Sequence, residues 1–315
     1  MAKKDSTNQV SQGHGTVEGN PHSLIGGFHA LTDTHPSYHN PISGGEKWTA
    51  SIDMLRISVR FTDETWALGH ADVLIVADET RVLPVDTRIG HYRHMWVYPC
   101  GDSTVTFGVG HNGKGGKVDM RSGVIECNPN KCAGDERLFK LFSVLAPHVA
   151  KATVKRYDLA FDVPISRNRC RLTKDRRTYN SYISNGITET LGVRNAVGHV
   201  RCYDKQAESG LLGVLTRIEL TCSGDWSAAE IQDKWPQVHA WTEGESTRDW
   251  VRVVGMLLSE KAERGEDIET YIAMLGRGSR PKVRECCRSG MIDLPKEAAE
   301  YAVNQAASWA KLLTA

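Results

Sequence analysis

Three short segments of this chain combine a tyrosine, basic residues and carboxylates at the spacing expected of β-strands. They are Arg156–Asp162, His199–Glu208 and Arg217–Glu219. In each segment every second residue is polar or charged, which is typical of a strand that buries one of its two faces. The positions of the polar groups therefore predict which side chains share a face.

Alternation places the polar residues of each segment on one side of its strand. If the three strands are neighbours, a tyrosine, a lysine, two arginines and at least three carboxylates meet on one sheet surface. The residues expected on this surface are Arg201, Tyr203 and Lys205 from one strand, Arg217, Glu219 and Thr221 from the next, and Asp158 and Asp162, flanking Ala160, from the third.

A tyrosine beside several carboxylates has the groups that covalent phosphodiester chemistry requires. The phenol can attack phosphorus, and the resulting ester keeps the bond energy, so that the strand can later be resealed. Tyrosine is a weak nucleophile at neutral pH, so we expect a divalent metal held by carboxylates and nearby cations, Lys205 and Arg201, to assist it. The alternative is a purely structural sheet surface on which tyrosine packs on lysine and arginine pairs with glutamate.

Composition limits where nucleic acid could bind. The chain has 315 residues, 24% of them charged, and a formal charge of only +1, so contacts with nucleic acid must come from local patches. One basic segment lies at 277–288, and the other is expected to contact the DNA backbone unless it is only a solvated loop. The DNA-binding candidates of that other segment are Arg167, Arg169, Arg171, Lys174, Arg176 and Arg177.

Several other classes of protein lack support in the sequence. We find no apolar signal core and no apolar run of 18 or more residues, and the eight cysteines follow no secreted pattern. The sequence therefore predicts a soluble cytoplasmic protein with reduced thiols and no membrane contact. The phosphate-binding GxxxxGK[ST] loop, the GxSxG and HExxH motifs, and the histidine pair with which many initiators hold metal are also absent.

The chain divides by composition into three parts. Residues 1–46 are rich in Gly, Ser, Asn, His and Pro, which predicts a disordered or loosely ordered arm. Residues 47–225 predict an α+β domain, with a curved and mostly antiparallel sheet, a hairpin around Cys100, and helices over 65–76 and from Asp135 to Val149. Residues 226–315 predict a helical extension with helices over 227–235, 247–264, 268–275 and 295–313.

The three segments, in this order, resemble motifs of the replication initiation factor family. This family comprises the Rep_trans-type rolling-circle replication initiators of Gram-positive plasmids and filamentous phages. The resemblance rests on Arg156-Tyr-Asp-Leu-Ala-Phe-Asp162, Val200-Arg-Cys-Tyr-Asp-Lys-Gln-Ala-Glu208 and Thr216-Arg-Ile-Glu-Leu220, and Ile52-Asp-Met-Leu-Arg56 is similar too. It covers about residues 50–222, and it departs from the family at 185–192, where a Gly-Ser-rich segment is usual.

The resemblance implies that Tyr203 nicks one strand of origin DNA and becomes linked to its 5′ end. It also implies that Lys205 lies beside the scissile phosphate, that a magnesium or manganese ion is bound, that the protein acts as a homodimer, and that a host helicase is recruited. The implied metal-ligand candidates are Asp158, Asp162 and Glu219, with Glu208 as a further acidic residue. Tyr179 and Tyr182 are rival nucleophiles, and a non-catalytic DNA-binding or regulatory protein is the alternative function.

Overall fold

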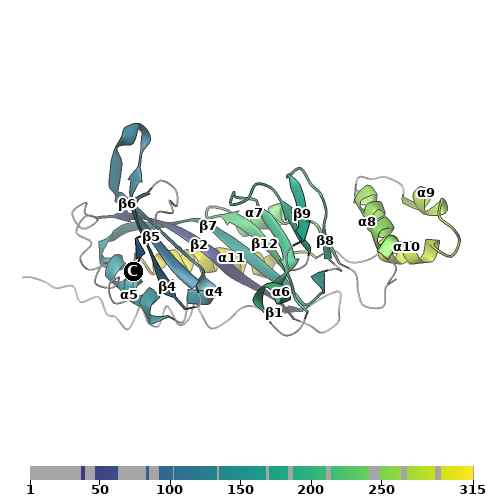
Figure 1. The fold of residues 1–315 in the computed structure, drawn as a ribbon, viewed down its shortest axis with the longest axis horizontal. Helices are drawn as coiled ribbons and strands as arrows, with labels where there is room; N and C mark the ends of the chain where they lie inside the picture. The colour runs from purple at the N-terminus through teal and green to yellow at the C-terminus, as the bar shows by residue number, and fades with distance from the viewer. Residues whose placement is uncertain are drawn as a thin grey trace, which may run out of the picture.

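A computed structural model describes the parts of the chain on which the architecture rests. These are residues 37–39, 47–62, 83–84, 92–101, 103–132, 135–167, 170–183, 187–210, 214–240, 249–263, 268–287 and 292–314. The described part of the chain contains one large antiparallel sheet with helices beside it (Figure 1), so the predicted α+β class is confirmed. The predicted helix over 65–76 and most of the 1–46 arm lie outside the described residues.

The large sheet is open and has eleven strands in the order β3-β4-β5-β6-β2-β7-β12-β11-β10-β9, with β1 paired to β2. A separate two-stranded sheet pairs β8 with β13. The strands are β1 (Ser37–His39), β2 (Lys47–Phe61), β3 (Leu83–Pro84), β4 (Tyr92–Cys100), β5 (Ser103–Asn112), β6 (Val118–Cys127), β7 (Val149–Val163), β8 (Cys170–Leu172), β9 (Tyr179–Ile183), β10 (Ile187–Leu191), β11 (Val200–Asp204), β12 (Thr216–Ser223) and β13 (Val238–Ala240).

The two longest described helices, α8 and α11, lie near the C-terminal end of the chain. They are η1 (Lys114–Gly116), α4 (Pro129–Cys132), α5 (Glu136–Leu145), η2 (Ala146–His148), α6 (Lys205–Ser209), α7 (Ala228–Lys234), α8 (Asp249–Glu263), α9 (Ile268–Ala273), α10 (Arg280–Cys287) and α11 (Lys296–Lys311). None of the described helices is both long and apolar enough to cross a membrane.

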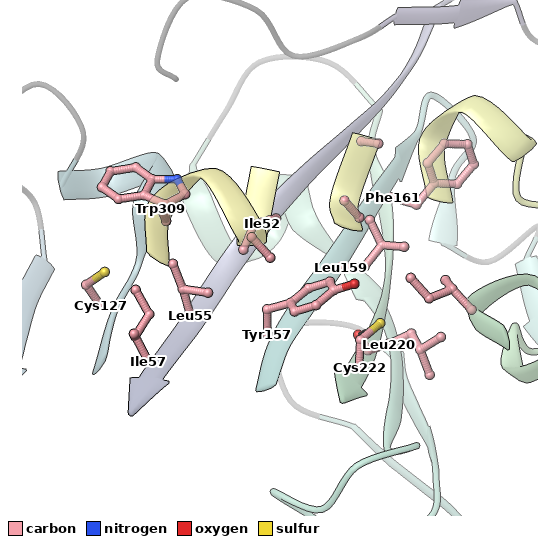
Figure 2. Close-up of a cluster of buried hydrophobic side chains, with 14 of the residues drawn as sticks. Ile52, Leu55, Ile57, Cys127, Tyr157, Leu159, Phe161, Leu220, Cys222 and Trp309 are labelled. Atoms are coloured by element: carbon pink, nitrogen blue, oxygen red, sulfur yellow. Dashed lines mark hydrogen bonds between the residues drawn. The ribbon is translucent and has the colours of Figure 1, made fainter. Parts of the chain in front are cut away.

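The two central strands, β2 and β7, have one face that is buried in the core and one face that is polar. Leu159, Phe161 and Val163 of β7 are fully buried on the core face, as their alternation predicts. Helix α11 packs on this face against both strands. Its small buried residues, such as Ala302, let it approach closely, while Trp309 fills the space beside the core residues of β2 (Figure 2).

Helix α5 begins where the sequence predicts but ends earlier than predicted. Asp135 caps it by accepting a hydrogen bond from the backbone N–H of Arg137. The apolar pattern predicts helix as far as Val149, yet α5 ends at Leu145 and the turn η2, which contains Pro147, leads directly into β7. Val149 is buried as the first residue of that strand, so its apolar character reflects the sheet and not the helix.

Only part of the 226–315 segment lies apart from the sheet. Ile231 of α7 and Trp309 of α11 belong to the same buried core as the central strands. Helices α8, α9 and α10 form a second, smaller core around Val251, Leu258 and Ile272, and Figure 1 shows them beyond β8 and β9. The 226–315 segment is therefore not one extension, because α11 helps to complete the core of the 47–225 region.

Candidate functional site

Strands β7, β12 and β11 are neighbours, so the three motif segments meet on one sheet surface. Tyr203 lies opposite Arg217, and Arg217 in turn lies opposite Asp162. In the adjacent row, Arg201 lies opposite Glu219, which lies opposite Ala160. The polar residues of the motifs thus form two parallel rows on the face that is turned away from α11.

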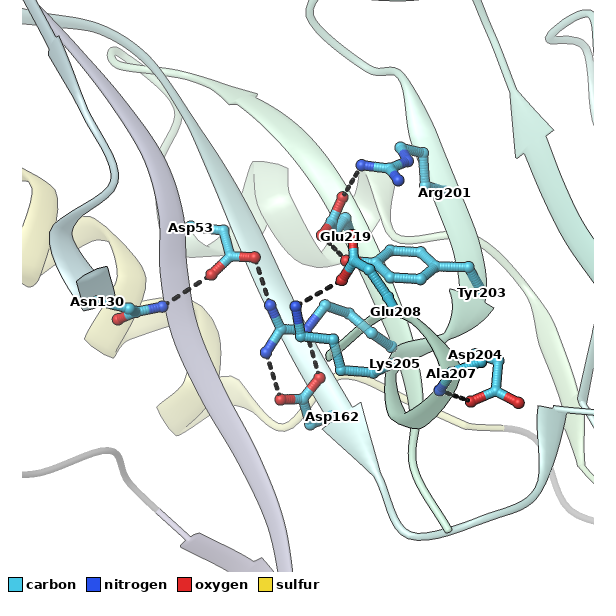
Figure 3. A network of polar contacts seen from close by, with 11 residues as sticks. Asp53, Asn130, Asp162, Arg201, Tyr203, Asp204, Lys205, Ala207, Glu208 and Glu219 are labelled. Carbon is cyan, nitrogen blue, oxygen red and sulfur yellow. Dashed lines mark hydrogen bonds and ion pairs between the residues drawn. The ribbon is translucent and has the colours of Figure 1, made fainter. Parts of the chain in front are cut away.

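Tyr203, Glu219 and Arg201 make direct contacts with one another (Figure 3). The Tyr203 hydroxyl donates a hydrogen bond of 2.5 Å to Oε1 of Glu219, and Arg201 Nη1 donates one of 3.0 Å to Oε2 of the same carboxylate. The Arg201 guanidinium also lies over the tyrosine ring, 4.5 Å from its centroid. Each carboxylate oxygen of Glu219 therefore has a defined partner, and the arginine holds both the base candidate and the phenol ring.

Burial changes the proton affinities of this pair. Burial raises the pKa of Glu219 to about 7, although Arg201 and the Tyr203 hydroxyl act in the opposite direction. Burial, with the neighbouring Glu219 carboxylate, raises the pKa of Tyr203 as well. A carboxyl with a pKa near neutrality, in hydrogen-bond contact with a phenol, has the properties of a general base for that phenol.

Arg217 is the centre of a second network that the sequence did not reveal in full. Its Nε and Nη2 atoms each donate a 2.6 Å hydrogen bond to Asp162, and its Nη1 atom pairs with Asp53. Asn130 donates to the other oxygen of Asp53 at 2.9 Å. Burial lowers and the two carboxylates raise the pKa of Arg217, and the net effect is upward, so the guanidinium stays charged.

Asp53 reaches the site because β2 contains a bulge. The register between β2 and β7 shifts between Ile52 and Met54, so that Ile52 and Leu55 both face the core. An uninterrupted strand would place residues 52 and 55 on opposite faces. The odd spacing of these two apolar residues, and the likeness of Ile52-Asp-Met-Leu-Arg56 to the family motif, are the signals in the sequence that could have indicated the role of Asp53.

Lys205 and Glu208 are not on the strand with Tyr203, contrary to the alternation argument. Strand β11 ends at Asp204, whose side chain accepts a hydrogen bond from the backbone N–H of Ala207 and caps α6. Lys205 is therefore the first residue of a helix, and its amine pairs with Glu208 at 2.6 Å. Glu208 is close enough to Arg201 and Tyr203 to help raise the pKa of each, but the Lys205 charge is already partnered (Figure 3).

Asp158 and Glu219 line a pocket of about 450 Å³ on the same sheet face. Burial raises the pKa of Asp158, while Thr221 and Arg156 lower it. The remaining lining residues come from β9, β10, β11, β12 and the turn before β11. They are Asn180, Tyr182, Thr190, Arg194, Asn195, His199, Arg201 and Thr221.

The four metal-ligand candidates do not gather at one point. Asp162 is paired with Arg217, and Glu208 is paired with Lys205. Within the described ranges, no three or more His, Cys, Asp and Glu side chains are grouped as a metal site. Asp158 and Glu219 line the same pocket, and one or two carboxylates are enough for Mg²⁺ when a substrate phosphate is present, but Glu219 must release Arg201 or Tyr203 to bind it.

The two rival tyrosines have different surroundings. The Tyr179 hydroxyl donates a 3.0 Å hydrogen bond to Glu189, which is buried together with Arg167. Tyr182 is 49% exposed and lines the same pocket as Glu219, whereas Tyr203 is only 4% exposed and is not part of the pocket lining. Tyr182 is therefore the more accessible of the two to a molecule in this pocket.

Several basic residues of the 167–177 segment make contacts within the protein and do not face solvent as free charges. Arg167 is buried, pairs with Glu189 and donates to two backbone carbonyls, so its charge is not available to a phosphate. Arg171 donates to the carbonyls of Arg167 and Cys170, and Arg177 pairs with Asp175. Lys174 and Arg176 are exposed, and Arg169 lies outside the described residues.

The chain is similar in structure to a known protein, although no family model or curated protein matches it. No protein-family model matches the chain, and no curated protein matches it. Among solved structures, it is similar to a rolling circle replication initiator protein from Geobacillus stearothermophilus, with 17% sequence identity and a TM-score of 0.36. The match covers 67% of this chain and 96% of that one.

Proposed function

We propose that this chain is a DNA-nicking enzyme that starts rolling-circle replication through a tyrosine–phosphodiester intermediate. The observation that carries the proposal is the 2.5 Å hydrogen bond from the Tyr203 hydroxyl to Glu219, in a pair that Arg201 holds in place. A nucleophile in contact with its base, with a third group that orients the base, is the arrangement that covalent catalysis requires. The motif resemblance points to the same chemistry.

In the proposed reaction, Glu219 takes the phenol proton and the Tyr203 oxygen attacks the phosphorus of the scissile bond. The bond from phosphorus to the 3′ oxygen breaks, and Glu219 returns the proton to that leaving oxygen. The products are a 5′-phosphotyrosyl strand and a free 3′-hydroxyl, and the reverse reaction reseals the strand. Arg201, which lies over the tyrosine ring, stabilises the negative charge that develops on the Tyr203 oxygen as its proton leaves.

Asp158 and Glu219 are the carboxylates that would hold a divalent ion, which when bound neutralises charge on the phosphate oxygens. Magnesium or manganese dependence is therefore part of the proposal. Binding of origin DNA, action as a homodimer and recruitment of a host helicase remain predictions from the motif resemblance.

The low exposure of Tyr203 favours one alternative function. A phenol that is 4% exposed must become accessible before it can attack, and an inaccessible one would leave a DNA-binding protein that does not cut. Incubation with Mg²⁺ or Mn²⁺ and a supercoiled plasmid that carries the origin distinguishes the two functions. A nicking enzyme of the proposed kind yields open circles with protein attached, a water-activating nuclease yields open circles without protein, and a non-catalytic protein yields neither.

The nucleophile is identified by two matched variants. We expect Tyr203→Phe to abolish both nicking and the covalent adduct while binding of duplex DNA stays within a factor of a few, because only the attacking oxygen is removed. Tyr182→Phe should retain both activities. Mapping of the adduct to Tyr182 or Tyr179 by mass spectrometry, or an active Tyr203→Phe variant, would contradict the assignment.

A further inference from the structure

The pocket beside the Tyr203–Glu219 pair has features that the nicking reaction alone does not require. Its volume of about 450 Å³ lies in the range of small-molecule sites, roughly 300–1,000 Å³. Its lining extends well beyond the carboxylates, across β10 to the edge strand β9. A phosphate group by itself would occupy only a part of this space.

The floor of the pocket is a row of cross-strand partners with different polar groups. Asn180 lies opposite Thr190, which lies opposite Arg201, which lies opposite Glu219. This row offers an amide, a hydroxyl, a guanidinium and a carboxylate, so it contains both hydrogen-bond donors and acceptors. A nucleobase edge also presents donors and acceptors side by side, and an unpaired base leaves them free for recognition.

Tyr182, which is two residues from Asn180 on the edge strand β9, supplies an aromatic surface beside this row. It projects from β9, is 49% exposed and makes no ring contact among the described residues. Bases of single-stranded DNA stack on such exposed aromatic rings regardless of sequence.

Arg194 adds a cation on the opposite side of the pocket. It lies in the turn between β10 and β11, where Gly192, Asn195 and Gly198 all have positive φ values (88°, 63° and 83°). Arg156 donates a 2.5 Å hydrogen bond to the carbonyl of Asn195, which fixes the turn. Arg194 is exposed and has no ion pair among the described residues, so its charge is available to a phosphate.

We propose that this pocket binds one unpaired nucleotide next to the scissile phosphate, with its base stacked on Tyr182 and its phosphate beside Arg194. The placement next to the cut rests on the proposed nicking function, because Glu219 both lines the pocket and accepts the hydrogen bond of the Tyr203 hydroxyl. A base that is still paired in a duplex cannot enter such a pocket. The site therefore selects single-stranded or locally melted DNA.

Binding of a short fluorescein-labelled oligothymidylate, followed by anisotropy in the Tyr203→Phe protein without metal, tests the proposal in the absence of cleavage. We expect Tyr182→Ala to weaken binding roughly tenfold, because it removes one stacked base. Tyr182→Phe should bind as the parent does, since the ring remains. Trp250→Ala, which removes another exposed aromatic side chain that does not line the pocket, is the matched control and should also bind normally.

A second variant does not depend on Tyr182. Arg194→Gln alters an exposed turn residue and should flatten the dependence of log affinity on log salt by about 0.7 for one lost single-strand phosphate contact. An unchanged affinity in Tyr182→Ala together with an unchanged salt slope in Arg194→Gln would overturn the proposal. Equal losses in Tyr182→Phe and Tyr182→Ala would overturn the stacking role, since they would show that the hydroxyl matters and not the ring.

These binding results are independent of the nicking test. If no DNA is nicked but Tyr182→Ala loses oligothymidylate affinity, the nucleotide pocket stands and the nicking function fails. If an adduct forms on Tyr203 while the pocket variants bind normally, only the pocket fails.

Discussion

Replacing Glu219 by glutamine tests the centre of the proposed site. The amide keeps the shape of the side chain and can still accept a hydrogen bond from Tyr203, but it cannot take the phenol proton and is a poor ligand for a hard cation. Loss of a general base costs about 10²–10⁴-fold in rate. We therefore expect Glu219→Gln to lower the rate of nicking by at least about a hundredfold.

The same substitution should not destabilise the protein above neutral pH. A pKa raised from 4.5 to about 7 means that the folded state holds the proton of Glu219 more tightly than the unfolded state does. This contribution to stability is present below about pH 4.5 and is lost as the pH rises towards 7. At 1.36 kcal/mol per pKa unit, the ionised carboxylate costs the folded protein about 3 kcal/mol at pH 8.

Glutamine resembles the protonated form and avoids this cost. In a chelator at pH 8, Glu219→Gln should therefore melt several degrees above the wild type, and the difference should disappear near pH 4.5. Melting by calorimetry at the two pH values, together with plasmid nicking in Mg²⁺, measures both effects. A variant that nicks at the wild-type rate would refute the catalytic role, and one that melts earlier at pH 8 would refute the reasoning on the buried charge.

Four further predictions concern the surroundings of this pair. Asp158→Asn should lose metal-dependent nicking while keeping its fold by circular dichroism, and retained nicking would remove Asp158 from the proposed metal site. Arg217→Met leaves two largely buried carboxylates without their cation, so urea unfolding should show a loss of about 3–5 kcal/mol; a near-neutral effect would mean that these carboxylates are well solvated. Replacing exposed Lys174 and Arg176 by glutamine should flatten the salt dependence of duplex binding by about 0.9 in log–log slope per lost phosphate contact, whereas an unchanged slope would indicate a solvated loop. Replacing 241–291 by a short linker should leave cleavage of a single-stranded oligonucleotide intact, since Ile292 hydrogen-bonds Val238 and α11 is retained; loss of cleavage by a folded variant would place part of the active site in α8–α10.

Local patterns in the sequence determined the strands of the site and the faces of their side chains. Alternation in β7 correctly separates Asp158 and Asp162 from the buried Leu159 and Phe161, because each side chain of a strand has only two directions available. The start of α5 at Asp135 follows from capping, which is also a local interaction. The pairing of β11 with β12 then brought Tyr203 and Glu219 together on the shared face that alternation predicts.

The tertiary structure alone decided features that depend on contacts between distant segments. The bulge that turns Asp53 towards Arg217 lies where β2 pairs with β7, so it belongs to a contact with a strand far along the chain. Arg167 reads as a surface cation, but a buried glutamate twenty-two positions later supplies its partner. The pocket joins β7, β9, β10, β11 and β12, whose order in the sheet no periodicity encodes, since that order is set by the burial of side chains far apart in the chain.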